Sequence, residues 1–179
     1  LMDPAKAVRT LTAAGLEVFA GFIVGFDGDD AGIFDRQLEF ISSLPIPRAM
    51  VGTLSALPGT ALWRRLEREG RLRALPSGDQ FDRPNFEPAM GEEALVAGYR
   101  RPLQALYTDE AYFSRCELHL ETAPVRATSM RPGSLGTVAR AVWRLGILGP
   151  RRRFFWRLLG RALRTGGLPS AVKAVTLAI

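Results

Sequence analysis

The sequence predicts an α/β fold followed by a mostly helical region, and three observations support this prediction. Two near-continuous apolar runs, LEVFAGFIVGF and AMVGTLSAL, alternate with segments of helical periodicity, which is typical of strands in a parallel sheet. Beyond these runs, the sequence has only helix-like and irregular segments. The charge changes too, because residues 1–121 carry 13 Lys and Arg against 18 Asp and Glu, whereas residues 122–179 carry 11 basic residues and no acid.

The α/β part follows the order helix, strand, helix, strand, helix. Asp3 is suited to cap the first helix, Pro4 to begin it and Gly15 to end it. Asp29 or Asp30 can cap the second helix. The βαβ order predicts two parallel strands joined by a crossover helix, and the apolar first strand is expected to be covered on both faces. The expected segments are 3–15, 16–26, 31–44, 49–57 and 61–70.

The remainder is predicted to be irregular at first and then helical. Residues 73–91 are rich in Pro, Gly and Asp. A helix over 92–107 should be kinked by Pro102, and Thr108 is suited to cap the helix that follows it. Aromatic residues at helical spacings are expected in the core, namely Tyr99, Tyr107, Tyr112 and Phe113. After an expected hinge over 122–134, basic apolar helices are predicted at 135–148, 151–166 and 170–179.

Composition limits the classes of function. The single cysteine, Cys116, excludes an internal disulfide framework and a self-contained cysteine-ligated zinc or iron–sulfur site. Neither Cys116 nor the single histidine, His119, has neighbours in sequence that mark it as a ligand or base. No signal peptide and no uncharged run of membrane-spanning length is present, so a cytoplasmic setting is expected. The chain starts without Met and stops inside a predicted helix, so we expect a fragment of a longer protein.

The stretch GFIVGFDGDD, residues 21–30, raises the question of a metal loop. Counted from Asp27, the calcium-loop pattern would need oxygen ligands at Ala31 and Leu38, which have none to offer. We therefore expect no metal site. The three carboxylates of Asp27, Asp29 and Asp30 are interpreted as helix-capping and solvated groups.

Two interpretations remain open for the ends of the two strands. Glycines in a strand most often serve packing, so Gly21 and Gly25 can be purely structural. The carboxyl ends of parallel strands are also where α/β folds bind ligands, and a backbone edge without Cβ atoms admits a flat base. The candidate binding residues at these two ends are Gly21, Ile23, Gly25, Ser55, Leu57 and Pro58.

The order of motifs resembles the last third of a radical S-adenosylmethionine (SAM) barrel. Gly21, Ile23 and Gly25 match the G-x-I-x-G strand of this family, and ALPGT matches the turn after its sixth strand. The segments NFEPAM, AGYRR, LYTDEAYFSRC and RRRFFWRLL resemble the C-terminal domain of unassigned role in the cobalamin-binding branch that includes the hopanoid C-2 methylase. Nearly the whole chain is covered by this resemblance.

The resemblance implies a TIM-like partial (β/α) barrel end over residues 1–75 and a helical domain over 76–179. It implies SAM, a [4Fe-4S] cluster and cobalamin in the parent enzyme, which would methylate an unactivated carbon of a small or lipid-like substrate. Gly21, Ile23 and Gly25 would lie against the adenine of SAM. The C-x-x-x-C-x-x-C cluster motif and the cobalamin domain are absent here. The chain alone is therefore expected to be inactive, with the missing N-terminal portions as its partners.

The alternative is a non-enzymatic basic module. Residues 151–164, RRRFFWRLLGRALR, mix arginines with aromatic and aliphatic residues, which favours peripheral contact with an anionic membrane, here the inner membrane. The same composition can track the phosphates of nucleic acid, which we rank lower. A third interpretation is a cover packed on the missing domains.

Overall fold

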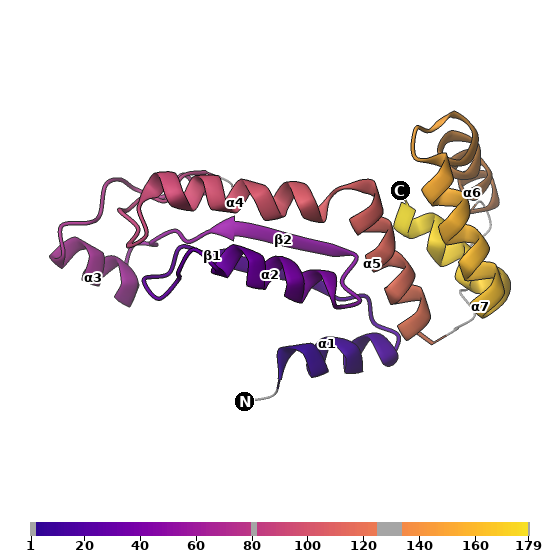
Figure 1. Cartoon of the computed structure of the whole chain (residues 1–179), viewed down its shortest axis with the longest axis horizontal. Helices are drawn as coiled ribbons and strands as arrows, with labels where there is room; N and C mark the ends of the chain where they lie inside the picture. Colours follow the sequence, from indigo (N-terminus) through magenta and orange to yellow (C-terminus); the bar gives the residue numbers. More distant parts are fainter. Residues whose placement is uncertain (1–2, 80–81, 125–133, 179) are drawn as a thin grey trace. The chain divides into compact units, whose positions relative to one another are not determined.

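The computed structural model describes residues 3–79, 82–124 and 134–178 (Figure 1). They form two compact units that interleave along the chain. The strand unit comprises 20–39 and 49–106, and the helical unit comprises 1–19, 40–48 and 107–179, in both cases as far as the chain is described. The predicted domain boundary at residue 75 stays a prediction.

The βαβ prediction is confirmed in the strand unit. Strand β1, Phe19–Val24, is followed by helix α2, Ile33–Ser42, and strand β2, Arg48–Thr53. The strands pair in parallel, and the pairing extends to the Leu54 N–H, which donates to the Val24 carbonyl over 2.8 Å. These two strands establish an α/β arrangement, whereas the predicted barrel is not confirmed.

One face of β1 is open, contrary to the expectation that the strand is covered on both sides. The side chains of Phe19 and Ile23 are 61% and 50% exposed, whereas Val24 is fully buried. Alternate strand residues point to opposite faces. Within the described residues, therefore, other parts of the chain cover only one face of this apolar strand.

Helix α4, Glu92–Leu106, packs on α2 and on the end of β1. It runs beside β2 and α2 in Figure 1. A Cβ atom on Gly98 would lie 2.1 Å from the ring of Phe34, and one on Gly25 would lie 3.1 Å from Leu95. Pro102 is buried within this helix, which continues through it to Leu106. Small residues thus allow the close approach of α4.

The rest of the strand unit surrounds an apolar cluster. Helix α3, Ala61–Arg68, is capped by Thr60 in a strand-to-helix turn. An isolated antiparallel bridge joins Leu72 to Phe86 inside the segment predicted to be irregular. The buried members of this cluster are Ala56, Leu66 and Phe86.

The helical unit contains the predicted first helix and all the C-terminal helices. Helix α1, Pro4–Ala13, begins after Asp3, whose carboxylate accepts the Ala5 N–H over 3.0 Å. The others are α5, Asp109–Thr122; α6, Ser134–Val142; the π-helix η1, Trp143–Leu148; and α7, Arg152–Ala178. Helix α7 breaks at Gly167, which has φ of 63°, so the two predicted helices 151–166 and 170–179 are confirmed as separate pieces. The predicted hinge lies mostly outside the described residues.

The apolar core of the helical unit lies between α5 and α7, which run side by side (Figure 1). Phe113 and Tyr99, in their respective units, are buried as predicted, but Tyr107 is 41% exposed and Tyr112 is half-buried. The core prediction was thus wrong for Tyr107, because helical spacing alone does not tell which face of a helix meets a neighbour. The buried core residues are Phe113, Cys116, Leu120, Leu158, Ala162, Ala174 and Leu177.

Ion pairs between α5 and α7 use much of the basic charge of the tail. Arg157 contacts Glu110 and Glu117 over 2.9 and 2.7 Å, and Arg161 contacts Glu117 and Glu121. Glu117 is only 6% exposed. A buried carboxylate needs such partners, whereas exposed pairs stabilise by less than about 1 kcal/mol each. The opposite charges of the two halves therefore meet inside the helical unit.

The contact between Gly98 and Phe34 makes a testable prediction. Gly98→Ala should lower the free energy of unfolding by about 1 kcal/mol, because overpacking costs about 1–3 kcal/mol while alanine gains about 1 kcal/mol in helix propensity. Gly160→Ala, at a helical position with no atom within 4 Å, is the matched control and should be neutral or stabilising. Urea denaturation measures both. Equal stability of the two variants would contradict tight packing at Gly98.

Candidate functional site

The predicted binding residues of β1 lie on its open face. Gly21 and Ile23 are exposed, and a Cβ atom built on Gly21 meets nothing within 4 Å. Successive odd-numbered residues of the strand share this face. The backbone at Gly21 is therefore free of steric cover, which fits the approach of a flat base.

Gly25 has a different environment. It is buried, with φ of +104°, a conformation that favours glycine. The N–H groups of Gly25 and Phe26 donate to one carboxylate oxygen of Asp29 over 2.8 and 3.0 Å. The Gly25 N–H thus already has an acceptor in this chain, so only Gly21 and Ile23 of the motif offer an open surface.

The three aspartates of the opening stretch have separate structural roles. Asp29 binds the strand end, and Asp30 lies before α2, where it accepts the Gly32 N–H over 2.9 Å. Asp27 pairs with Arg65 and, over 2.7 Å, with Arg71. The hydrogen bond from Arg71 is the main reason that the pKa of Asp27 is lowered. The capping interpretation is confirmed only for Asp30, because the other two carboxylates hold the loop instead.

The end of β2 is held by Asn85, which is 7% exposed. Its amide oxygen accepts the Ala56 N–H over 2.8 Å, and its amide nitrogen donates to the carbonyls of Ala56 and Ala74 over 2.9 and 3.0 Å. The Ser55 hydroxyl also contacts the amide oxygen, over 3.3 Å. The Ser55 side chain is therefore engaged within the protein.

Leu57 and Pro58 follow on the surface. Leu57 is 54% exposed, and its carbonyl accepts the Thr60 hydroxyl over 2.7 Å. Thr60 in turn accepts the Trp63 N–H over 3.1 Å, so the turn is a helix cap. Phe26, at the end of β1, is 48% exposed. The two strand ends thus both present uncovered apolar side chains.

The residues of this chain do not fit an iron–sulfur cluster. Cys116 is fully buried, and burial raises the pKa of its thiol to about 11. A cluster needs several thiolates, and one buried thiol supplies none. Among the described residues, no three His, Cys, Asp or Glu side chains come together as a metal site. The same residues include no helix that is both long and apolar enough to cross a bilayer.

Comparison with known proteins gives the chain its family. Residues 60–179 match the domain of unknown function DUF4070. The chain belongs to this family. DUF4070 is a C-terminal domain of cobalamin-binding radical SAM methylases, so the resemblance seen in the sequence is confirmed. No solved structure matches.

Two curated relatives extend the similarity into the strands. The chain is 35% identical over 159 residues to an "uncharacterized methyltransferase" of Synechocystis, covering 85% of this chain and 30% of that protein. It is 28% identical over 185 residues to the hopanoid C-2 methylase of Rhodopseudomonas palustris, covering 97% of this chain and 34% of that protein. The chain therefore spans about a third of these relatives.

The predicted site residues and the matched family domain occupy different parts of the chain. Gly21, Ile23, Gly25, Ser55, Leu57 and Pro58 all precede residue 60, where the DUF4070 match begins. Asn85 lies within the match, and sequence reasoning missed its role. The segment NFEPAM that contains Asn85 carried the only signal, since a lone buried amide has no periodicity to reveal it.

The Asn85 contacts make a second prediction. Asn85→Ala should lower the free energy of unfolding by about 2–3 kcal/mol, because it leaves the buried N–H and the buried carbonyl of Ala56 without their partner. Gln104→Ala, at an exposed position of α4, should change it by less than about 0.5 kcal/mol. Thermal or urea denaturation compares the two variants. Matching stabilities would refute a clamp at Asn85.

Proposed function

We propose that this chain is part of a cobalamin-dependent radical SAM methylase and supplies a wall of its SAM and substrate pocket. The single observation that supports the wall is the open backbone face at Gly21 on a strand that matches the family's G-x-I-x-G pattern. The names of two relatives, a methyltransferase and a hopanoid C-2 methylase, support the reaction class. We propose a small or lipid-like molecule as the substrate.

The three cofactors would supply the chemistry of radical formation and methyl transfer, and this chain would orient SAM. Gly21 and Ile23 would face the adenine, since a strand without a Cβ atom allows close approach of a base. Gly25 would act through shape, because its N–H is bound by Asp29. Leu57, Pro58 and Phe26 would exclude water from the pocket mouth. The [4Fe-4S] cluster and cobalamin would be bound by portions outside these 179 residues.

Substitution of Gly21 tests the adenine wall in the protein encoded by the whole reading frame, reconstituted with iron, sulfide and cobalamin. Gly21→Leu should raise the KM for SAM at least tenfold, because the side chain would fill the space of the base. Gly136→Leu places the same side chain at another uncovered glycine and should leave KM unchanged. 5′-Deoxyadenosine formation is the readout.

Two results would contradict this proposal in different ways. An unchanged KM for SAM in Gly21→Leu would remove the adenine wall but not the methylase. A reading frame that lacks C-x-x-x-C-x-x-C upstream of Leu1 would remove the radical SAM reaction itself, since the cluster would have no ligands.

We also propose that the helical unit makes peripheral contact with an anionic membrane. Phe155 and Leu158 are buried, and Arg151 pairs with Asp109 over 2.7 Å, so much of 151–164 is engaged within the unit. The exposed apolar surface lies nearby, on η1 and the start of α7. Its members are Trp143, Ile147, Leu148 and Trp156, which are 57%, 47%, 69% and 48% exposed.

Trp156 lies against η1, and positive charge accompanies these apolar side chains in the same segments. The Trp156 indole donates to the Gly146 carbonyl over 2.8 Å, which places Trp156 against η1. Arg144 and Arg152 are exposed in the same segments. Aromatic and aliphatic side chains beside arginines are the mixture that binds at the headgroup layer of anionic bilayers. A lipid-like substrate would be reached from that layer.

Vesicle co-sedimentation tests the membrane contact. The chain should bind vesicles of phosphatidylglycerol but not of phosphatidylcholine, and Trp143→Ser with Leu148→Ser should reduce the bound fraction at least tenfold. Leu75→Ser, at a position that is 73% exposed in the strand unit, is the matched control. Unchanged binding of the double variant, or binding of single-stranded DNA with none to vesicles, would overturn the proposal.

A further inference from the structure

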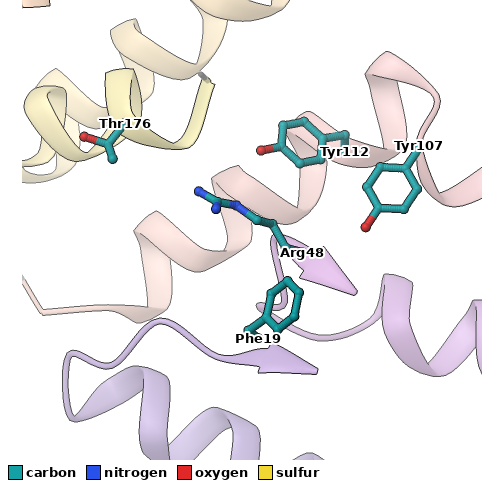
Figure 2. A pocket seen from close by; sticks show the side chains of 5 residues that line it. All are labelled: Phe19, Arg48, Tyr107, Tyr112 and Thr176. Atoms are coloured by element: carbon teal, nitrogen blue, oxygen red, sulfur yellow. The ribbon is translucent and has the colours of Figure 1, made fainter. Parts of the chain in front are cut away.

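A hollow of about 640 Å³ lies in the helical unit, at the starts of both strands (Figure 2). It is lined by Phe19, Arg48, Tyr107, Tyr112 and Thr176. Phe19 and Arg48 are the first residues of β1 and β2, and the tyrosines lie just before and within α5. Its volume falls in the range of small-molecule sites. The predicted SAM-binding residues lie near the opposite, carboxyl ends of the strands or follow those ends.

The guanidinium of Arg48 has N–H donors available for a ligand in this hollow. Figure 2 shows its guanidinium between Phe19 on one side and Tyr112 and Thr176 on the other. Its ion pair with Glu17 is long, at 3.8 Å, and its side chain is 49% exposed. A guanidinium carries five N–H donors in a planar fork that matches carboxylate and phosphate oxygens. Glu17 thus neutralises the positive charge of Arg48 only weakly.

A second guanidinium lies behind the wall of the hollow. Arg115 is 1% exposed, and its Cζ atom lies 5.7 Å from the centre of the Tyr107 ring. It donates to the carbonyls of Ile46 and Ala111 over 3.0 and 3.1 Å, while its Nη2 has no partner in the described structure. No carboxylate of the described residues forms an ion pair with it. A buried cation without an ion-pair partner is costly, so an anion bound nearby would be electrostatically favoured.

The rings around Arg48 make an apolar wall. Tyr107 and Tyr112 stack with centroids 6.4 Å apart and planes 26° apart. The Tyr112 hydroxyl donates to the Leu177 carbonyl over 2.6 Å. Burial raises the pKa of Tyr112 to about 12, so its phenol stays neutral at pH 7 and adds no competing negative charge. Phe19 presents a third ring, which is 61% exposed.

We propose that this hollow binds a small molecule with an anionic head group, a phosphate or a carboxylate, and a flat or apolar body. Arg48 receives the head in charge-assisted hydrogen bonds, and Arg115 adds a favourable field from behind Tyr107. The rings of Phe19, Tyr107 and Tyr112 cover the body. The inference stands apart from the proposed methylase, since it uses residues of the helical unit alone.

Isothermal titration of the chain with defined probes tests this site. Phenyl phosphate and benzoate carry a ring with one or the other head group, inorganic phosphate carries the head alone, and phenol carries the ring alone. At least one of the first two should bind at least tenfold more tightly than both inorganic phosphate and phenol. Which one binds identifies the head group. Failure of both ring-bearing anions to bind would overturn the proposal.

Variants locate the binding. Arg48→Gln should lower the affinity for the probe at least tenfold, which is the effect expected from losing a charge-assisted hydrogen bond. Arg9→Gln, at another exposed arginine of the helical unit, should leave it unchanged. Phe19→Ala should weaken a ring-bearing probe without changing the affinity for inorganic phosphate. An affinity that survives Arg48→Gln in a protein with an unchanged melting temperature would place the anion elsewhere and refute the site.

Discussion

The carboxamide of Asn85 joins three parts of the strand unit that are distant in sequence. It binds both backbone groups of Ala56, just past the end of β2, and the carbonyl of Ala74, while its own backbone carbonyl accepts N–H groups of Arg73 and Ala74. Because the two Ala56 groups are buried, losing the amide would leave them without water as a substitute. The direction in which Leu57 and Pro58 leave the strand follows from this clamp, and so does the start of α3.

Local signals in the sequence were enough to predict most of the elements. Asp3 and Thr108 cap helices as expected, and the apolar runs form parallel strands, because caps and periodicity act over a few residues. Exposure was harder to predict. The run around Ile23 is apolar enough for a fully covered strand, but cover depends on neighbours that the local sequence does not contain. The prediction that Tyr107 is buried was wrong for the same reason.

The candidate site shows the same division between local and tertiary information. The glycines of β1 could be singled out from their spacing, but their environments differ completely: Gly21 faces open space, while Gly25 lies against Leu95 with its N–H bound to Asp29. The acceptor role of Asp29 comes from a turn that reverses the chain within four residues. The strong charge asymmetry of the chain similarly suggested a basic external face, yet carboxylates of α5 pair with two arginines of α7, Arg157 and Arg161.

The burial of Cys116 has a practical consequence for measuring motion. With a thiol pKa of about 11, roughly one part in ten thousand of this side chain is thiolate at pH 7, so it reacts slowly with maleimides and spin-label reagents. A cysteine placed at an exposed position in each unit, such as Leu75 and Leu168, would therefore be labelled selectively in the wild-type background. Fluorescence transfer or dipolar spectroscopy between two such labels can report the distribution of distances between the strand unit and the helical unit.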